Sequence, residues 1–355
     1  MPKKYNIAID VSPLSDGNST RGVGYYTKNL VAALHSEVKT NPLYKNFSIH
    51  LIQNSKFEIK NFDLVHYPYF DPFFLTLPPK KNIPQIITIH DLIPLEFPQH
   101  FPVGIRGYIK WLIQKYRAKM SDYIITVSHH SKYAISDILR YPVDQIYVTY
   151  EGANSSFQPI SDKNQLSLIK KKYSLPDKFI LYVGDINWNK NIRTLVNACQ
   201  KLNYHLIIVG SSATKKVTHH PWTQDILWLQ GQNSPYIHCL GFISDLELPY
   251  IYNLATIYCQ PSFAEGFGLP LIEAMQSGTP IVYSRSTSLP ELAGDCGLSF
   301  DPLDQISLEK SLTRLWNNPT LRQQQTKKGL HQSLQFKWQY TAIQTLALYD
   351  LALTS

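Results

Sequence analysis

Strand-like and helix-like segments alternate along the whole chain, and this alternation runs twice. The first run begins with the apolar strand 5–11 and the second with the strand 178–184. Between them the rhythm breaks at 151–159, EGANSSFQP, whose Gly, Asn, Ser and Pro residues are typical of a linker. Repeated strand–helix alternation favours parallel sheets covered by helices. We therefore predict an α/β protein with two Rossmann-like, doubly wound domains, residues 1–156 and 157–336.

Length, charge and hydropathy limit the kind of fold that the chain can adopt and the kind of partner that it can bind. A chain of 355 residues with 44% hydrophobic residues can bury a core in each of two domains. A net charge of +8 favours anionic partners such as nucleotides, phosphates or acidic lipids. Nucleic acid is not expected, because no RNP, zinc-finger or helix-turn-helix signature is present. No stretch approaches the roughly 20 apolar residues that span a bilayer, and Asp10 interrupts the first apolar run too early for a signal peptide.

The cysteines indicate the redox compartment. None of the four belongs to a CxxC pair. We expect reduced, buried thiols in a cytoplasmic protein, with neither zinc nor a disulfide. These residues are Cys199, Cys239, Cys259 and Cys296.

Two candidate positions follow strands of the first domain. Doubly wound sheets bind ligands beyond the carboxyl ends of their strands, and two such domains favour a site in the cleft between them. In STRGVGYYTKNL, Gly22 and Gly24 open a helix, where small residues and free amides suit an anion. In ITIHDL, His90 and Asp91 end a strand. A plain helix start and a structural histidine are the alternatives.

A third candidate follows the first strand of the second domain. Gly184 ends that strand, and Lys190 is interpreted as opening the next helix. A lysine there opposes the helix dipole and is better tolerated with a bound anion. A solvated lysine is the alternative.

The fourth candidate is the segment 262–282, SFAEGFGLPLIEAMQSGTPIV. Glu265 precedes its helix and Glu273 lies inside it, and neither is placed to pair simply with a nearby lysine. We expect the amides of Gly266–Leu269 to point past the helix start. They can donate to sugar hydroxyls or a phosphate, while Glu265 accepts from hydroxyls.

The segment 101–120, FPVGIRGYIKWLIQKYRAKM, interleaves basic and aromatic residues. This pattern suits a membrane surface or a lipid-diphosphate acceptor. A packed helix with a solvated basic face is the alternative.

Seven segments, taken in order, resemble the family 4 glycosyltransferases (GT4), which are retaining enzymes of the GT-B fold. They are RGVGYYTKNL, HDLIPLEFP, SHHSKYAISDIL, YVGDINWNKNIRTLVNA, LGFISDLELPYIYNLA, PSFAEGFGLPLIEAMQSGTPIV and SLPELAGDCGLSFDP. The resemblance implies two facing domains, the first on the acceptor side and the second binding a nucleotide sugar. It also implies that the last helix, 337–355, crosses back onto the first domain.

The resemblance implies a role for each matching residue. Glu273 would bind the ribose, Glu265 the donor sugar, and Lys190 the diphosphate. His90 would lie beside the anomeric carbon. The backbone around the donor would come from Gly22, Gly24, Gly184, Gly266, Phe267, Gly268 and Leu269. Two positions depart from the family pattern, since Asn189 replaces a frequent arginine and Asp185 replaces a frequent basic residue.

The resemblance further implies a hexosyltransferase of polysaccharide biosynthesis that is bacterial mannosyltransferase-like. GDP-mannose is the first candidate donor, and UDP- or other sugars stay open. The acceptor is expected to be a glycan or a lipid-linked glycan, which keeps peripheral association with the inner face of the membrane open. No metal is expected, because no DxD is present and Asp245-Leu246-Glu247 is explained by a capping box between Ser244 and Glu247. The alternatives are a GT-B sugar-nucleotide epimerase and a catalytically weak sugar-nucleotide-binding protein.

Overall fold

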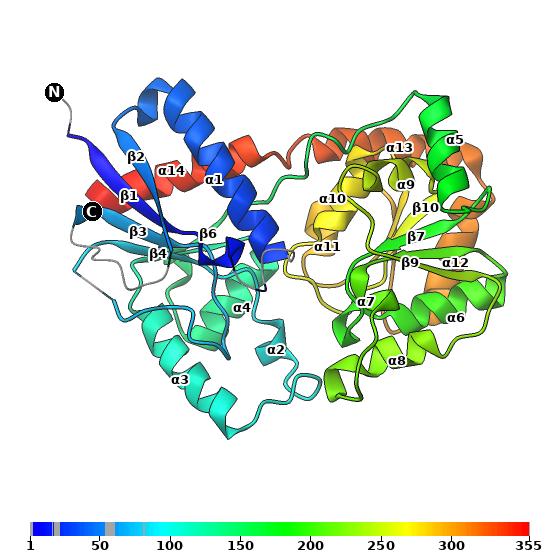
Figure 1. The fold of residues 1–355 in the computed structure, drawn as a ribbon, viewed down its shortest axis with the longest axis horizontal. Coiled ribbons are helices and arrows are strands. Elements are labelled where there is room, and N and C mark those ends of the chain that lie inside the picture. The colour runs from blue at the N-terminus through cyan, green and yellow to red at the C-terminus, as the bar shows by residue number, and fades with distance from the viewer. Residues whose placement is uncertain (1–2, 16, 18–21, 54–60, 81, 355) are drawn as a thin grey trace. The chain divides into compact units, whose positions relative to one another are not determined.

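The computed structural model describes residues 3–15, 17, 22–53, 61–80 and 82–354. The chain divides into two compact units, each with a sheet and a core of its own (Figure 1). The first unit contains residues 1–152 and 336–355, and the second contains 153–335.

The first unit is built on six parallel strands in the order β2-β1-β3-β4-β5-β6. The order reverses between β1 and β3, which creates a switch point at the carboxyl ends of these strands. Strands β3 and β4 are buried along their whole length, so both of their faces are covered. The strands are β1 (Tyr5–Asp10), β2 (Phe47–Ile52), β3 (Leu64–Tyr67), β4 (Gln85–Thr88), β5 (Tyr123–Thr126) and β6 (Ile146–Val148).

Five α-helices are described in the first unit. Helix α1 opens at Gly22 and buries Tyr26, Leu30 and Leu34, as its apolar spacing predicts. The chain's last helix, α14, packs along α1 (Figure 1). The elements are α1 (Gly22–Thr40), α2 (Ile93–Glu96), α3 (Ile105–Lys119), α4 (His129–Leu139) and α14 (Trp338–Thr354), with short 3-10 turns at η1 (Ser12–Leu14), η2 (Pro42–Tyr44) and η4 (Val143–Gln145).

The second unit repeats this plan with six parallel strands in the order β12-β11-β10-β7-β8-β9. The order reverses between β7 and β10, so the loops after these two strands meet at the second switch point. The strands are β7 (Ile180–Val183), β8 (Leu206–Val209), β9 (Ile237–Gly241), β10 (Ile257–Gln260), β11 (Ile281–Ser284) and β12 (Leu298–Phe300).

The helices of the second unit cover both faces of its sheet (Figure 1). They are α5 (Lys163–Lys172), α6 (Ile192–Leu202), α7 (Ser211–Thr214), α8 (Gln224–Gln230), α9 (Leu248–Leu254), α10 (Leu269–Gln276), α11 (Leu289–Ala293), α12 (Gln305–Trp316) and α13 (Pro319–Ser333), with 3-10 turns at η5 (Trp188–Lys190) and η6 (Pro221–Thr223).

The expected capping box at the start of α9 is wrong. The helix begins at Leu248, and no side chain caps it. The Glu247 carboxylate instead accepts hydrogen bonds from Lys172 Nζ at 2.5 Å and from the Tyr173 hydroxyl at 2.7 Å. The Glu247 carboxylate therefore bonds to Lys172, the last residue of α5, and to Tyr173, which follows it. It does not bond to the local backbone amide that the pattern SDLE suggested.

All four cysteines are free thiols. Cys199, Cys259 and Cys296 are buried as expected, and burial raises their pKa values, whereas Cys239 is only partly buried. Within the described residues, no helix is both long and apolar enough to span a bilayer. No three His, Cys, Asp or Glu side chains of the described chain are grouped so that they could hold a metal ion.

Candidate functional site

The loops after β7 and β10 are joined along their backbones in the second unit. The Asn189 carbonyl accepts from the Phe263 amide at 2.7 Å, and Asn189 Nδ2 donates to the Ala264 carbonyl at 2.9 Å. The ring of Trp188 stacks on that of Phe263, with centroids 5.2 Å apart. These contacts bring residue 190 beside residue 265, although the two are 75 positions apart in the sequence.

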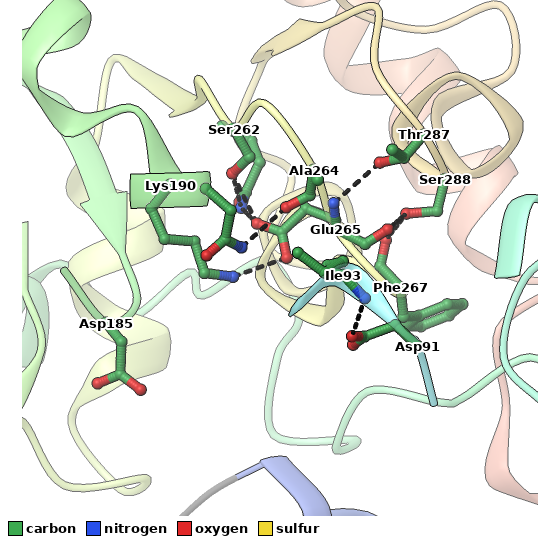
Figure 2. A network of polar contacts seen from close by, with 12 residues as sticks. Asp91, Ile93, Asp185, Lys190, Ser262, Ala264, Glu265, Phe267, Thr287 and Ser288 are labelled. Atoms are coloured by element: carbon green, nitrogen blue, oxygen red, sulfur yellow. Dashed lines mark hydrogen bonds and ion pairs between the residues drawn. The ribbon is translucent and has the colours of Figure 1, made fainter. Parts of the chain in front are cut away.

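Glu265 is the centre of a polar network at this switch point (Figure 2). One carboxylate oxygen, Oε2, accepts from Lys190 Nζ at 2.7 Å. The other, Oε1, accepts from Gln260 Nε2 at 2.5 Å and from Ser262 Oγ at 2.6 Å. The Glu265 side chain is buried, whereas that of Lys190 keeps 20% of its surface exposed. An ammonium group has three donors, so Lys190 has further donors to offer an anion after bonding to Glu265.

Lys190 does not open a helix, which corrects the sequence interpretation. It ends the 3-10 turn η5, and α6 begins at Ile192. Between them Asn191 adopts a left-handed backbone with φ 51°, a conformation that asparagine tolerates better than most residues. Its side chain donates to the carbonyls of Pro261 and Pro302 at 3.0 and 3.1 Å. The position of Lys190 therefore depends on this turn and not on a helix dipole.

The segment Gly266–Leu269 leads into α10, whose first residue is Leu269. Gly268 has φ +121°, and a Cβ there would lie 2.7 Å from Leu289 Cδ2, so only glycine fits. The loop before α11 holds the segment from the other side, since the Ser288 hydroxyl donates to the carbonyls of Glu265 and Phe267 (Figure 2). In the first turn of α10, Pro270 has no amide and the Leu271 amide donates to the Gly268 carbonyl at 2.9 Å, so the amide donors of this segment lie at Leu269 and before it.

Glu273 lies on α10 and is buried. Its Oε2 accepts from the Tyr252 hydroxyl at 2.8 Å. Burial raises the pKa of Glu273 to about 7. Burial raises the pKa of the Tyr258 hydroxyl, and nearby charges that include Glu265 and Glu273 raise it further.

Gly184 and Asp185 follow β7 directly. Gly184 has φ +150°, and a Cβ on Gly210, at the end of β8, would lie 2.1 Å from the Gly184 carbonyl oxygen. Two neighbouring loops therefore approach each other more closely than side chains allow. Asp185 is exposed at the same end of the sheet.

The first unit carries the other candidate residues. Gly22 is the first residue of α1, and a Cβ there would meet nothing within 4 Å, so steric crowding does not require glycine at this position. Gly24 is buried in the first turn of α1. The preceding residues 18–21, which belong to the same motif, lie outside the described residues. Asp91 Oδ1 accepts from the Ile93 amide at 3.1 Å, at the start of α2 (Figure 2).

His90 follows β4 by two residues. The ring of Tyr26 packs edge-on against it, with centroids 4.6 Å apart. His90 Nε2 is buried, and no hydrogen-bond partner is found for it among the described residues. Burial lowers the pKa of His90 to about 4, so the imidazole is neutral at physiological pH. An orphaned buried nitrogen costs free energy that a substrate hydroxyl could offset.

A buried chain of hydrogen bonds reaches Tyr26, whose ring packs against His90, and the sequence did not indicate it. Tyr349 Oη bonds with His66 Nδ1 at 2.6 Å, and His66 Nε2 bonds with Thr88 Oγ1 at 2.8 Å. The Tyr26 hydroxyl lies 3.4 Å from the same Thr88 oxygen. His66 is the polar residue inside the apolar strand DLVHY, which is the signal that could have revealed it.

In the structure, the candidate residues fall into two groups. Lys190, Glu265, Gly266–Leu269 and Glu273 come together at the switch point of the second unit, with Gly184 on the adjoining loop. The residues of the other group, Gly22, Gly24 and His90, belong to the first unit.

Known proteins match both units. A family model described as glycosyl transferases group 1 matches residues 167–332, and one described as Glycosyltransferase Family 4 matches residues 20–157. The O-antigen chain mannosyltransferase B of Escherichia coli is 32% identical over 298 residues, which are 81% of this chain and 75% of that protein. The MMP alpha-(1->4)-mannosyltransferase of Mycolicibacterium hassiacum is 28% identical over 325 residues, 88% of this chain and 76% of that protein.

A solved structure shows the same fold. Sucrose-phosphate synthase from Thermosynechococcus elongatus superposes with a TM-score of 0.75 at 19% identity, covering 98% of this chain and 99% of that one. Two parallel-sheet units of this kind are the GT-B architecture, as the resemblance to family 4 implied. Given this fold, the two family models and a relative at 32% identity, the chain belongs to the family 4 glycosyltransferases.

Proposed function

We propose that this glycosyltransferase moves a sugar from a nucleotide sugar to a glycan or lipid-linked acceptor in polysaccharide biosynthesis, with retention of anomeric configuration. GDP-mannose is the first candidate donor, since the two relatives above are named mannosyltransferases. The observation that carries the proposal is the Lys190–Glu265 pair at the switch point of the second unit.

The second unit would bind the donor. Lys190 would use its remaining ammonium donors on the diphosphate, joined by backbone amides at the start of α10, with Gly184 giving the backbone close approach. Glu265 would accept from the sugar hydroxyls and Glu273 from the ribose. Positive charge and helix-start amides that are already in place stabilise a departing nucleoside diphosphate.

The first unit would serve the acceptor side. Gly22 and Gly24 would let the start of α1 approach the donor closely. His90, neutral and with a buried nitrogen lacking a partner among the described residues, would hydrogen-bond to the reacting sugar beside its anomeric carbon.

Retention would follow from displacement on the front face of the sugar. The bond between the anomeric carbon and the phosphate oxygen breaks while the acceptor oxygen bonds to that carbon. The acceptor proton passes to the departing phosphate oxygen. Glu265 is a poor nucleophile, because its carboxylate already accepts from three side chains. We propose that Lys190 and backbone amides neutralise the leaving group without a metal ion, as the sequence lacks a DxD.

The relatives are transferases, so an epimerase or a catalytically weak binding protein is not favoured. A lipid-linked acceptor would place the enzyme in the cytoplasm as a peripheral protein on the inner face of a membrane.

A donor panel tests the proposal. The purified chain is incubated with GDP-mannose, UDP-glucose or UDP-N-acetylglucosamine, with and without lipid-linked glycans, and nucleoside diphosphate release is measured. We expect GDP release from GDP-mannose that is at least roughly tenfold faster with acceptor, and an α-linked product by NMR. Conversion of a donor without acceptor would favour the epimerase, and binding without release would favour a binding protein.

A further inference from the structure

Helix α3 is buried on one side and exposes apolar side chains on the other. One side packs into the first unit through Trp111, Gln114 and Ala118, which are buried. The opposite side carries apolar side chains that face solvent, which reverses the usual polar outer face of a surface helix. This exposed row, here called the α3 stripe, consists of Ile105, Tyr108, Ile109, Leu112, Ile113 and Tyr116.

The orientation of α3 is fixed by hydrogen bonds, so its stripe cannot turn inward. Gln114 Nε2 donates to Thr76 Oγ1 at 2.7 Å and to the Asp71 carbonyl at 3.2 Å. Lys115 Nζ donates to the Ile138 carbonyl of α4 at 2.6 Å. The stripe is strongly exposed, with 82% of Ile105 and 67% of Tyr116 accessible. The packed helix with solvated basic residues, which was the alternative, describes Arg106 and Lys119, but the outward face also carries exposed apolar side chains.

Positive charge borders the α3 stripe on both sides. The helix carries five basic residues and no acidic one. At about 100° per residue, Arg106, Lys110 and Arg117 fall along one edge of the stripe and Lys115 along the other, while Lys119 lies just inside that second edge at the end of the helix. Lys115 and Arg117 donate to the carbonyls of Ile138 and Leu77, which leaves Arg106, Lys110 and Lys119 for lipid head groups. An apolar row beside such cations is the arrangement of a helix that lies in a bilayer interface.

A neighbouring loop extends the apolar surface. Phe74 and Leu75 are exposed, and the ammonium of Lys110 lies 5.1 Å from the centre of the Phe74 ring. The loop therefore continues the surface beyond the basic edge of the helix.

We propose that the α3 stripe binds the surface of a bilayer that contains anionic lipids, with α3 lying in the plane of that surface. Charge complementarity decides between occupants. A second copy of the chain would face the stripe with the same basic borders, so like charges would meet along both edges. An anionic lipid surface is complementary to the apolar row and to both borders at once. This inference rests on the proposed lipid-linked acceptor for its purpose and deepens it by assigning the surface that would bring the enzyme to that acceptor.

The test is co-flotation of the full chain with phosphatidylcholine vesicles, with and without about 30% phosphatidylglycerol. We expect binding to the anionic vesicles that weakens as salt is raised. The double variant Ile109→Glu/Leu112→Glu should lower partitioning at least roughly tenfold. Leu303→Glu, at a leucine of the second unit that is even more exposed, is the control and should bind as the wild type does.

A second variant tests the charges. Arg106→Gln/Lys110→Gln/Lys119→Gln keeps the α3 stripe and should lower affinity for anionic vesicles on the order of a hundredfold. Wild-type binding that is absent, or unchanged in both variants, would overturn the proposal. So would a dimer in light scattering that the glutamate variant abolishes, since a second copy would then cover the stripe.

The same variants separate this inference from the proposed function. Both should retain GDP release from GDP-mannose, because they lie outside the donor-binding residues. A chain that binds vesicles but never releases GDP would contradict the proposed donor and leave the docking surface standing. Release of GDP without vesicle binding would contradict the docking surface and leave the proposed donor standing.

Discussion

Glu265 and Glu273 lie eight positions apart in one segment, yet their surroundings give them different chemistry. Glu265 accepts from three side chains, one of them a lysine. Glu273 accepts from the Tyr252 hydroxyl, and burial raises its pKa to about 7. A carboxylate in such a position gains from hydroxyl donors supplied by a ligand. The proposed ribose contact would therefore stabilise the ionised form of Glu273.

Glu273→Ala should weaken binding of GDP-mannose by on the order of 1–3 kcal/mol, because the ribose hydroxyls lose their acceptor. Isothermal titration calorimetry measures this change directly. Glu247→Ala, which removes a surface carboxylate of the same unit, is the control and should bind as the wild type does. Equal affinities of Glu273→Ala and the wild type would remove Glu273 from the ribose site.

His90→Ala should slow transfer at least roughly tenfold while leaving the dissociation constant of GDP-mannose nearly unchanged. The reason is that His90 is proposed to contact the reacting sugar and not the nucleotide. Steady-state kinetics combined with calorimetry separates the two effects. His35→Ala, on the exposed side of α1, should match the wild type. Unaltered turnover in His90→Ala would exclude the histidine from the site.

Glu151 makes the stability of the first unit depend on pH. Burial raises its pKa from 4.5 to about 8, so the folded state favours the protonated carboxyl. The stability that this provides is fully present below pH 4.5 and is lost as the pH rises through about 8. Glu151→Gln should therefore be more stable than the wild type at pH 9 by on the order of 1–3 kcal/mol, with a much smaller difference at pH 5. Urea unfolding at both pH values checks this, and a constant difference would contradict it.

Sequence reasoning located both glutamates correctly in their loop and helix but missed the partner of Glu265. Gln260 and Ser262 are close to Glu265 in the sequence, whereas Lys190 comes from another loop. Such a pair depends on the strand order β10-β7, which no local pattern encodes. His66 was missed for a similar reason, because its partner Tyr349 lies 283 positions away.

At the scale of elements, the strand and helix pattern was predictable and the helix starts were less so. Strands 5–10, 180–183 and 281–284 fall where the apolar runs placed them. The start of α6 was misplaced because Asn191 turns the chain before the helix, and that turn is held by carbonyls of distant loops. The capping box predicted before α9 is wrong for the same reason, since Glu247 accepts from Lys172 and Tyr173, which are distant in the sequence.

Gly268→Ala tests the entry to α10. A Cβ would meet Leu289 at 2.7 Å and would occupy a backbone conformation that only glycine adopts readily, so stability should fall by roughly 1–3 kcal/mol. Donor binding should weaken as well, because the amides at the start of α10 would move. Gly104→Ala is the matched control, since its Cβ would meet nothing within 4 Å. Thermal unfolding of both variants gives the comparison, and equal midpoints would contradict the strain argument.

At the scale of the whole molecule, two repeats of the strand–helix alternation were enough to predict two doubly wound units. The alternation could not reveal on which unit helix α14 packs. Helix α14 follows the entire second unit in the sequence, yet it packs on α1 and reaches the first sheet through Tyr349. Only the resemblance to a known family implied this return.

Tyr349→Phe should destabilise the first unit and leave the second unchanged, because it removes the hydroxyl bonded to buried His66 at a cost of about 1–3 kcal/mol. Hydrogen exchange measured peptide by peptide distinguishes the units. We expect faster exchange in β3, β4 and α1 and unaltered exchange in β7, β10 and α10. Tyr340→Phe, at an exposed position of the same helix, should change neither unit. Uniform acceleration across the chain would show that the two units unfold together.

The membership of α14 in the first unit has a consequence for biosynthesis. On the ribosome, residues 1–152 emerge first but lack the helix that buries Tyr349 against His66. The second unit is continuous in the sequence, so it can complete its core before residues 336–355 are synthesised. The first unit cannot, because it includes those residues. Nascent chains stalled before α14 should therefore contain a folded second unit and an incompletely folded first unit, which chaperones still bind.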